Sequence, residues 1–336
     1  MISLFLQKLY GKKDFAVVAF SAFYALCAWA LGFHWNIMWM DTFALLPLVI
    51  LGEIALLREK RFFLYTATLF LAIYANYYVG FFVCIFVALV FFCYEICRFP
   101  GWKRAGLDLV RIAIFSLLAI GMTAVLELPT LAALQTTQSS VNAFPQGFRL
   151  NIASSNDWKG LLDAMRQVAG NLGGALEPNF KEGLPNIYCG VLPLLLVPLY
   201  LINRRISLRE KAVYIVLLLF LLFSFDNNAM NFIWHAFHFP NDLPFRFSYM
   251  YCFLVLVMAF RGLCRMRDIA YKDIVFVSLV WLLDVIVAQK FMTTKMSEIS
   301  IYVTIAFLIL WCGLLLCLQK SGFKKSVLAF AVIAMC

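Results

Sequence analysis

Charged residues are scarce in this sequence of 336 residues. They make up 14% of it, whereas hydrophobic residues make up 64%, and an ordinary soluble domain has about a quarter charged residues. No water-soluble fold buries that much apolar surface, so a soluble globular domain is excluded. The ten cysteines include no Cys-x-x-Cys pair, and nearly all of them fall inside apolar runs. We therefore expect small packing residues and no disulfide framework.

The apolar residues are grouped in runs long enough to cross a bilayer. A transmembrane helix needs roughly 20 mostly apolar residues, and such runs fill most of the chain. The sequence therefore predicts an all-α fold, a polytopic transmembrane helical bundle of about ten complete helices and a truncated eleventh. The predicted spans are 15–33, 42–57, 62–77, 79–97, 111–128, 186–202, 212–225, 246–264, 273–289, 299–318 and an incomplete 326–336.

Lysine and arginine are distributed unequally between the predicted connections. If the N-terminus is cytoplasmic, 21 of the 28 lie in predicted cytoplasmic segments, as the positive-inside rule requires. We therefore expect a multi-pass protein of the cytoplasmic membrane with its N-terminus inside. These residues form short juxtamembrane clusters, which favours membrane lipid as a partner. Despite the formal charge of +10, no nucleic-acid binding is predicted.

Most predicted connections are short, so we expect a single transmembrane bundle over residues 1–336. The exception is residues 129–184, a predicted extracytoplasmic loop rich in Ser, Asn, Gln, Gly and Pro. Within this loop the sequence predicts an interfacial helix at 157–169. Its cap would be Asn156 or Asp157, and its apolar residues have helical spacing.

Polar residues concentrate on the predicted outward side. The first outward turn holds His34, Trp35 and Asn36, and it places Asp41 where a helix N-cap belongs. Capping and catalysis are both compatible with a carboxylate at this position. The second outward turn, residues 76–80, begins with Asn76 and Tyr77 and ends in glycine, and a tight turn explains it as well as a binding site does.

The third outward segment places two charges at unfavourable ends of helices. Asp226 lies at a predicted helix C-terminus and Arg246 near a helix N-terminus, against the macrodipole in both cases. Arg246 can pair with Asp226 or Asp242, or it can bind phosphate oxygens bidentately. His235 and His238 have helical spacing, which permits a metal pair, but a hydrogen-bonded histidine is commoner. We therefore expect no metal and no cofactor.

Within the predicted spans, ionisable residues are few. Asp284 lies near the predicted bilayer centre, where such a group is a functional candidate by default. Glu53 and Glu95 lie nearer the inner surface, where pairing with basic loops is expected. A relay of such groups would serve proton-coupled transport, so a transporter stays open as an alternative.

Five segments resemble the YfhO family of bacterial membrane proteins, and they occur in family order. They are Trp35–Asp41, Leu46–Glu53, Asn76–Gly80, Leu184–Gly190 and Ile233–Ser248. The resemblance implies a GT-C-like glycosyltransferase, which takes a sugar from a polyprenyl-phosphate donor on the outer face of the bacterial cytoplasmic membrane. The acceptor would be a cell-surface glycopolymer. Full-length relatives have a preceding helix and acidic loop and continue beyond position 336, so the resemblance also implies a fragment.

Under this resemblance, each polar outward residue receives a role. Asp41 and Asp226 are the candidates for acid or base catalysis, and Arg246 would hold the donor phosphate. The alternative functions are a transporter or flippase for a lipid-linked or polar solute, and a noncatalytic scaffold. The residues expected to bind substrate are His34, Trp35, Asn36, Asn76, Tyr77, His235, His238 and Asn241.

Overall fold

The computed structural model describes residues 1–136, 185–240, 242–243, 245–291 and 298–319. These residues form helices joined by turns and contain no β-strand, which confirms the all-α class. The predicted interfacial helix at 157–169 and the incomplete span at 326–336 lie outside the described residues. Two compact units make up the chain.

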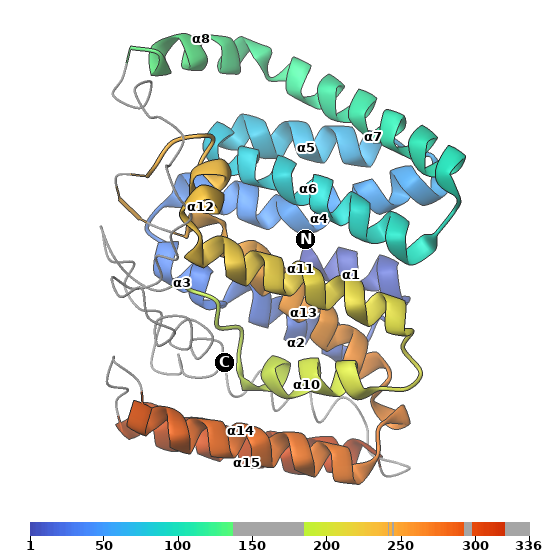
Figure 1. Ribbon diagram of the computed structural model, residues 1–336, viewed down its shortest axis with the longest axis vertical. Helices are drawn as coiled ribbons and strands as arrows, with labels where there is room; N and C mark the ends of the chain where they lie inside the picture. Colours follow the sequence, from blue (N-terminus) through green and yellow to red (C-terminus); the bar gives the residue numbers. More distant parts are fainter. Residues whose placement is uncertain (137–184, 241, 244, 292–297, 320–336) are drawn as a thin grey trace. The chain divides into compact units, whose positions relative to one another are not determined.

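Unit 1 consists of Met1–Leu9, His34–Leu150 and Phe223–Asn241. Figure 1 shows its long helices running nearly side by side, with α4 packed against α5, α6 and α7. α8 follows α7, and the short α12 packs on α6. The bounds are α1 (Ile2–Tyr10), α4 (Ile37–Glu59), α5 (Phe63–Ala75), α6 (Tyr77–Arg98), α7 (Trp102–Met122), α8 (Ala124–Leu134) and α12 (Asn228–Trp234).

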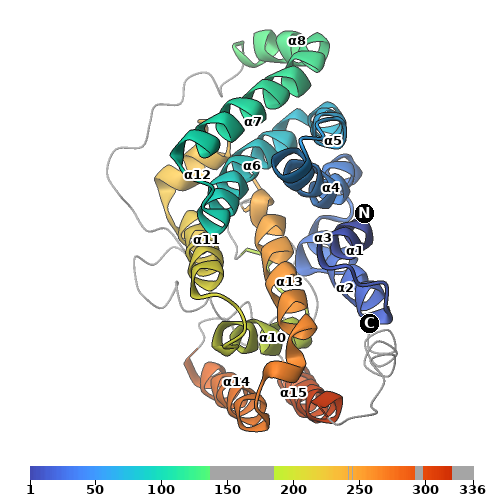
Figure 2. The same cartoon turned by 90° about the vertical axis from the view of Figure 1, so that its right-hand side faces the viewer.

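Unit 2 consists of Tyr10–Phe33, Asn151–Leu222 and Asp242–Cys336. Its centre is α13, which is buried along most of its length and contacts α2, α3 and α10. Figure 2 shows α14 and α15 as an adjacent pair. The bounds are α2 (Phe15–Ala25), α3 (Ala28–Phe33), α10 (Val191–Ile202), α11 (Leu208–Asp226), η3 (Arg246–Ser248), α13 (Tyr249–Cys264), η4 (Met266–Asp268), α14 (Tyr271–Phe291) and α15 (Glu298–Gln319); α11 ends within unit 1.

Among the described residues, five helices have the length and apolar composition to cross a membrane. They are α4, α6, α7, the continuous η3 and α13, and α15. The helices α2, α5, α8 and α10 are apolar but shorter. The polytopic helical class is therefore confirmed, while the full number of ten crossings stays a prediction.

Two predicted spans are interrupted by buried backbone that bonds to another segment. The span at 15–33 is broken after Leu26, and the amide of Ala28 donates to the carbonyl oxygen of Tyr188 at 2.8 Å. The span at 186–202 becomes helical only at Val191, because Gly190 has a φ of 102°. This one hydrogen bond joins the two irregular stretches and satisfies a backbone group of each. Hydropathy cannot reveal such a bond.

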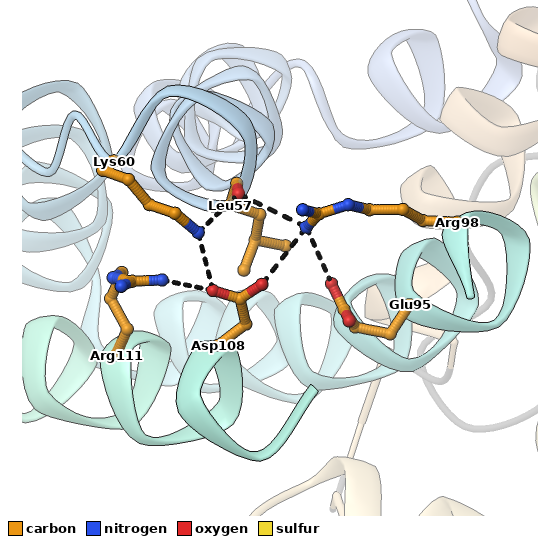
Figure 3. Close-up of polar contacts among 6 residues, drawn as sticks. All are labelled: Leu57, Lys60, Glu95, Arg98, Asp108 and Arg111. Carbon is orange, nitrogen blue, oxygen red and sulfur yellow. Dashed lines mark hydrogen bonds and ion pairs between the residues drawn. The ribbon is translucent and has the colours of Figure 1, made fainter. Parts of the chain in front are cut away.

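α7 begins nine residues earlier than the predicted span at 111–128, and the one carboxylate in this added stretch, Asp108, is neutralised by ion pairs. Asp108 accepts from Lys60 at 2.8 Å and from Arg98 at 3.1 Å, and it also contacts Arg111. The carbonyl oxygen of Leu57 accepts from Lys60 and Arg98 as well (Figure 3). This basic cluster, defined as Lys60, Arg98 and Arg111 around Asp108, ties α7 to α6 and to the end of α4.

Two glycines set the distance between the helices of unit 1. A Cβ on Gly52 would lie 2.6 Å from the Cα and the amide nitrogen of Tyr65, and one on Gly80 would lie 2.7 Å from the Cα of Ile73. These obstacles are backbone atoms, which cannot move aside as a flexible side chain can. α5 therefore packs against α4 and α6 only because both positions lack a side chain.

We expect Gly52→Ala to destabilise the protein. The added methyl group forces α4 and α5 apart, and overpacking of this kind costs about 1–3 kcal/mol. Gly121→Ala on α7 is the matched control, since a Cβ there meets nothing within 4 Å and alanine is the better helix former. Thermal unfolding in detergent should show a lower melting temperature for Gly52→Ala alone. Equal melting temperatures for the two variants would contradict the close approach of α4 and α5.

Candidate functional site

The segment after α11, which is predicted to face outward, folds into the short helix α12. Asn227 is its N-cap, and its side-chain oxygen accepts from the amide of Met230 at 3.0 Å. His235 ends the helix and is fully buried, with its Nδ1 2.7 Å from the carbonyl oxygen of Asn231. Backbone contacts therefore fix the orientation of this imidazole.

Aromatic rings of α6 surround both histidines of this segment. The centroid of the His235 ring lies 5.6 Å from that of Phe82 and 6.1 Å from that of Tyr78. The ring of His238 lies 5.7 Å from Tyr78, and His238 is half-buried. Tyr78 thus lies beside both imidazoles, although it was not among the predicted site residues. In the described part of the chain, no cluster of three histidine, cysteine or acidic residues is arranged to hold a metal ion.

The first outward turn leaves an exposed carboxylate near the start of α4. The helix begins at Ile37 with Asn36 in the N-cap position, and the amide of Trp39 donates to the carbonyl oxygen of Asn36 at 3.0 Å. The prediction of Asp41 as N-cap was therefore wrong, because the four residues before it already continue the helix. Asp41 is exposed in the second turn, and His34 and Trp35 are exposed just before the helix.

The second outward turn joins α5 directly to α6. Asn76 ends one helix and caps the next, and its side-chain oxygen accepts from the amide of Val79 at 2.9 Å. Tyr77 beside it is exposed. Thr42 links this turn to the first one, since its hydroxyl donates to the carbonyl oxygen of Ala72 at 2.9 Å. The three segments of unit 1 that are predicted to face outward therefore meet at one end of α4, α5 and α6.

Buried amides of the third outward segment have unmet hydrogen-bonding capacity. Asp226 is 5% exposed at the end of α11, and Asn227 after it is fully buried. Within the described residues, the side-chain nitrogen of Asn227 and the side-chain oxygen of Asn231 have no hydrogen-bond partner. Neither asparagine was among the residues predicted to form the site, although their cluster beside Asp226 was a usable signal.

Arg246 lies in unit 2, in the turn that leads into α13. Its Nε donates to the carbonyl oxygen of Leu243 at 2.9 Å, and one terminal nitrogen donates to that of Asp242 at 2.6 Å. Leu243 and Phe245 have φ of 57° and 61°, so the turn is tight. The indole of Trp29 donates to the carbonyl oxygen of Arg246 at 2.8 Å. The contact expected between Arg246 and Asp242 is thus made to the backbone carbonyl oxygen of Asp242.

The acids within the spans differ in their surroundings. Glu95 lies 3.6 Å from Arg98, which confirms the expected pairing. Glu53 on α4 is fully buried, and neither of its carboxyl oxygens has a hydrogen-bond partner in the described part of the chain. The expected pairing of Glu53 with a basic loop was therefore wrong. Asp284 is half-buried on α14.

Unit 1 thus contains most of the predicted site. Nine of the eleven predicted residues lie in it, Arg246 lies in unit 2, and Asn241 lies outside the described residues. The nine are His34, Trp35, Asn36, Asp41, Asn76, Tyr77, Asp226, His235 and His238.

The long apolar helices define a polytopic α-helical membrane protein. The sequence matches the family model described as bacterial membrane protein YfhO over residues 1–336. The chain therefore belongs to the YfhO family, as the resemblance of its motifs indicated. No curated protein and no solved structure matches it.

We expect Asn76→Ala to lower stability by about 1 kcal/mol, the usual cost of losing a side-chain cap. Asn36→Ala is the matched control, because Asn36 occupies an N-cap position without a side-chain cap bond, and its loss should change stability less. Thermal unfolding of both variants in detergent measures the difference. Equal losses would show that the contact of Asn76 with Val79 does not stabilise the turn.

Proposed function

We propose that the protein transfers a sugar from a polyprenyl-phosphate donor to a cell-surface glycopolymer on the extracytoplasmic side of the bacterial cytoplasmic membrane. The observation that carries this proposal is the gathering of carboxylate, imidazole, amide and aromatic groups at one end of unit 1. Membership of a bacterial membrane protein family supports it, and the excess of lysine and arginine in the opposite connections supports the orientation.

Asp41 is the preferred catalytic base in this proposal. Its carboxylate is exposed and does not cap a helix, so an acceptor hydroxyl can approach it. The carboxylate would take the hydroxyl proton while the hydroxyl oxygen bonds to the anomeric carbon. The bond from that carbon to the phosphate oxygen breaks, and the lipid phosphate leaves with the electron pair. Asp226 is the second candidate, although it is buried.

Arg246 is the proposed phosphate-binding residue. Its contacts with the carbonyl oxygens of Leu243 and Asp242 fix the guanidinium, and a fixed positive charge stabilises the charge that develops on a leaving phosphate. The exposed rings of Trp35 and Tyr77 offer apolar faces to a sugar. The remaining proposed substrate ligands are His34, Asn36, Asn76, His235, His238 and Asn241.

A transporter or flippase for a lipid-linked or polar solute is the second candidate. Two observations favour it: the fully buried Glu53 on α4 and the interruption between α2 and α3. Buried acids and broken helices are common where transporters bind their substrates. This function would leave sugar linkages unaltered while moving solute across the membrane.

We expect Asp41→Asn to lower sugar incorporation into surface polymer roughly a hundredfold or more, the usual loss when a general base is removed. The assay measures labelled sugar in the polymer of cells that carry the variant gene in place of the natural one, at equal protein level. Asp268→Asn is the control, since Asp268 is an acid in η4 paired only loosely with Arg265 at 3.9 Å.

Unchanged incorporation in Asp41→Asn cells would contradict the assigned base. Reconstituted vesicles test the alternative function. If they flip a fluorescent lipid-linked sugar and transfer none of it to acceptor, the protein is a transporter and the transferase proposal fails.

A further inference from the structure

The basic cluster lies at the end of unit 1 opposite α12 and takes no part in the proposed sugar transfer. Asp108 is 1% exposed, whereas the side chains of Lys60, Arg98 and Arg111 are 39%, 25% and 30% exposed. Figure 3 shows the three cations converging on this one carboxylate. The acid is enclosed, and the cations that cover it reach the surface of the unit.

The charges of the cluster do not balance. Besides Asp108, the nearby carboxylate is Glu95, whose oxygen lies 3.6 Å from a terminal nitrogen of Arg98. Three cations therefore face two acids. Two further arginines lie close enough to act electrostatically on residues near the cluster, Arg58 on Tyr94 and Arg104 on Glu95. Both arginines therefore add to the positive excess. Such an excess attracts an anion to this end of the unit.

Both arginines of the cluster retain hydrogen-bond donors. Toward the described residues, Arg98 and Arg111 each make their polar contacts through one terminal nitrogen, Nη1. The Nε and Nη2 donors of each guanidinium therefore have no partner in the described part of the chain. Two such N–H groups side by side match two oxygens of a phosphate. Because Asp108 already holds the guanidinium groups, binding costs little side-chain ordering.

An apolar surface continues directly from the cluster. Only 17% of the apolar stretch of α7 is buried, and Arg111 lies where the charged first turns of this helix give way to apolar ones. A ligand with its phosphate at Arg111 could therefore lay hydrocarbon along α7. The exposed apolar residues of this surface are Leu107, Val110, Ile114, Leu117 and Leu118.

We propose that Lys60, Arg98 and Arg111 bind the phosphate of an anionic phospholipid, whose acyl chains lie along the exposed apolar face of α7. Basic pockets between transmembrane helices bind such headgroups on the cytoplasmic side, which is where the positive-inside rule places this end. A free phosphate shares the headgroup chemistry but would gain nothing from the apolar face. The proposal is independent of the sugar-transfer reaction.

Native mass spectrometry of the purified full chain in detergent tests this binding, with phosphatidylglycerol, phosphatidylcholine and inorganic phosphate titrated separately. We expect preferential binding of phosphatidylglycerol and a loss of roughly fivefold in Arg111→Gln, the usual share of one basic residue. Arg111→Lys keeps the ion pair with Asp108 and loses the paired donors. It should bind more weakly than the natural protein, and it serves as the measured variant if Arg111→Gln unfolds.

Arg267→Gln is the matched control, because Arg267 is exposed in η4 and its loss changes the net charge equally. Its affinity for phosphatidylglycerol should stay within twofold of that of the natural protein. An equal loss of affinity in Arg267→Gln would show that net charge alone explains the effect, and it would overturn the proposal. Equal binding of both lipids would also overturn it, as would binding of inorganic phosphate that depends on Arg111 without any lipid preference.

Discussion

The structure depends on one constraint, which is that a backbone polar group in hydrocarbon must find its partner inside the protein. Two departures from regular helix in the described residues illustrate it. The amide of Ala28, at the break between α2 and α3, bonds to the carbonyl oxygen of Tyr188. Arg246 bonds to two carbonyl oxygens of the tight turn before α13. At the first place a second segment of the same unit supplies the missing bond, and at the second a side chain of the turn itself supplies it.

The same constraint governs charge. A carboxylate as enclosed as Asp108 costs several kcal/mol of desolvation unless cations and hydrogen bonds offset that cost, and three cations do so here. The effect extends to α7, because the neutralised Asp108 can be part of a helix that hydropathy would start only at Arg111. Glu53 is the contrary case, a fully buried acid without such partners among the described residues, and it is the feature that keeps transport under consideration.

Much of the fold could be predicted from the sequence, since the apolar runs fix which segments are helical. The predicted spans at 42–57, 79–97 and 299–318 fall inside α4, α6 and α15. The short α1 and α12 were missed, because neither has a long apolar run. The break after Leu26 was missed as well, because it depends on a bond to a residue more than 150 positions away. Hydropathy sums local transfer energies and contains no information about such pairings.

The candidate site was predictable by residue type and side of the membrane but not by the role of each residue. Asn76 and Asn36 are both N-cap residues, yet only Asn76 uses its side chain for the cap. His235 is enclosed by aromatic rings, whereas Asp41 is exposed. These differences arise from where helices begin, which sequence patterns fix only to within a few residues. A group that exchanges a proton with an acceptor must be within its reach, so exposure is what favours Asp41 over the buried Asp226 as the base.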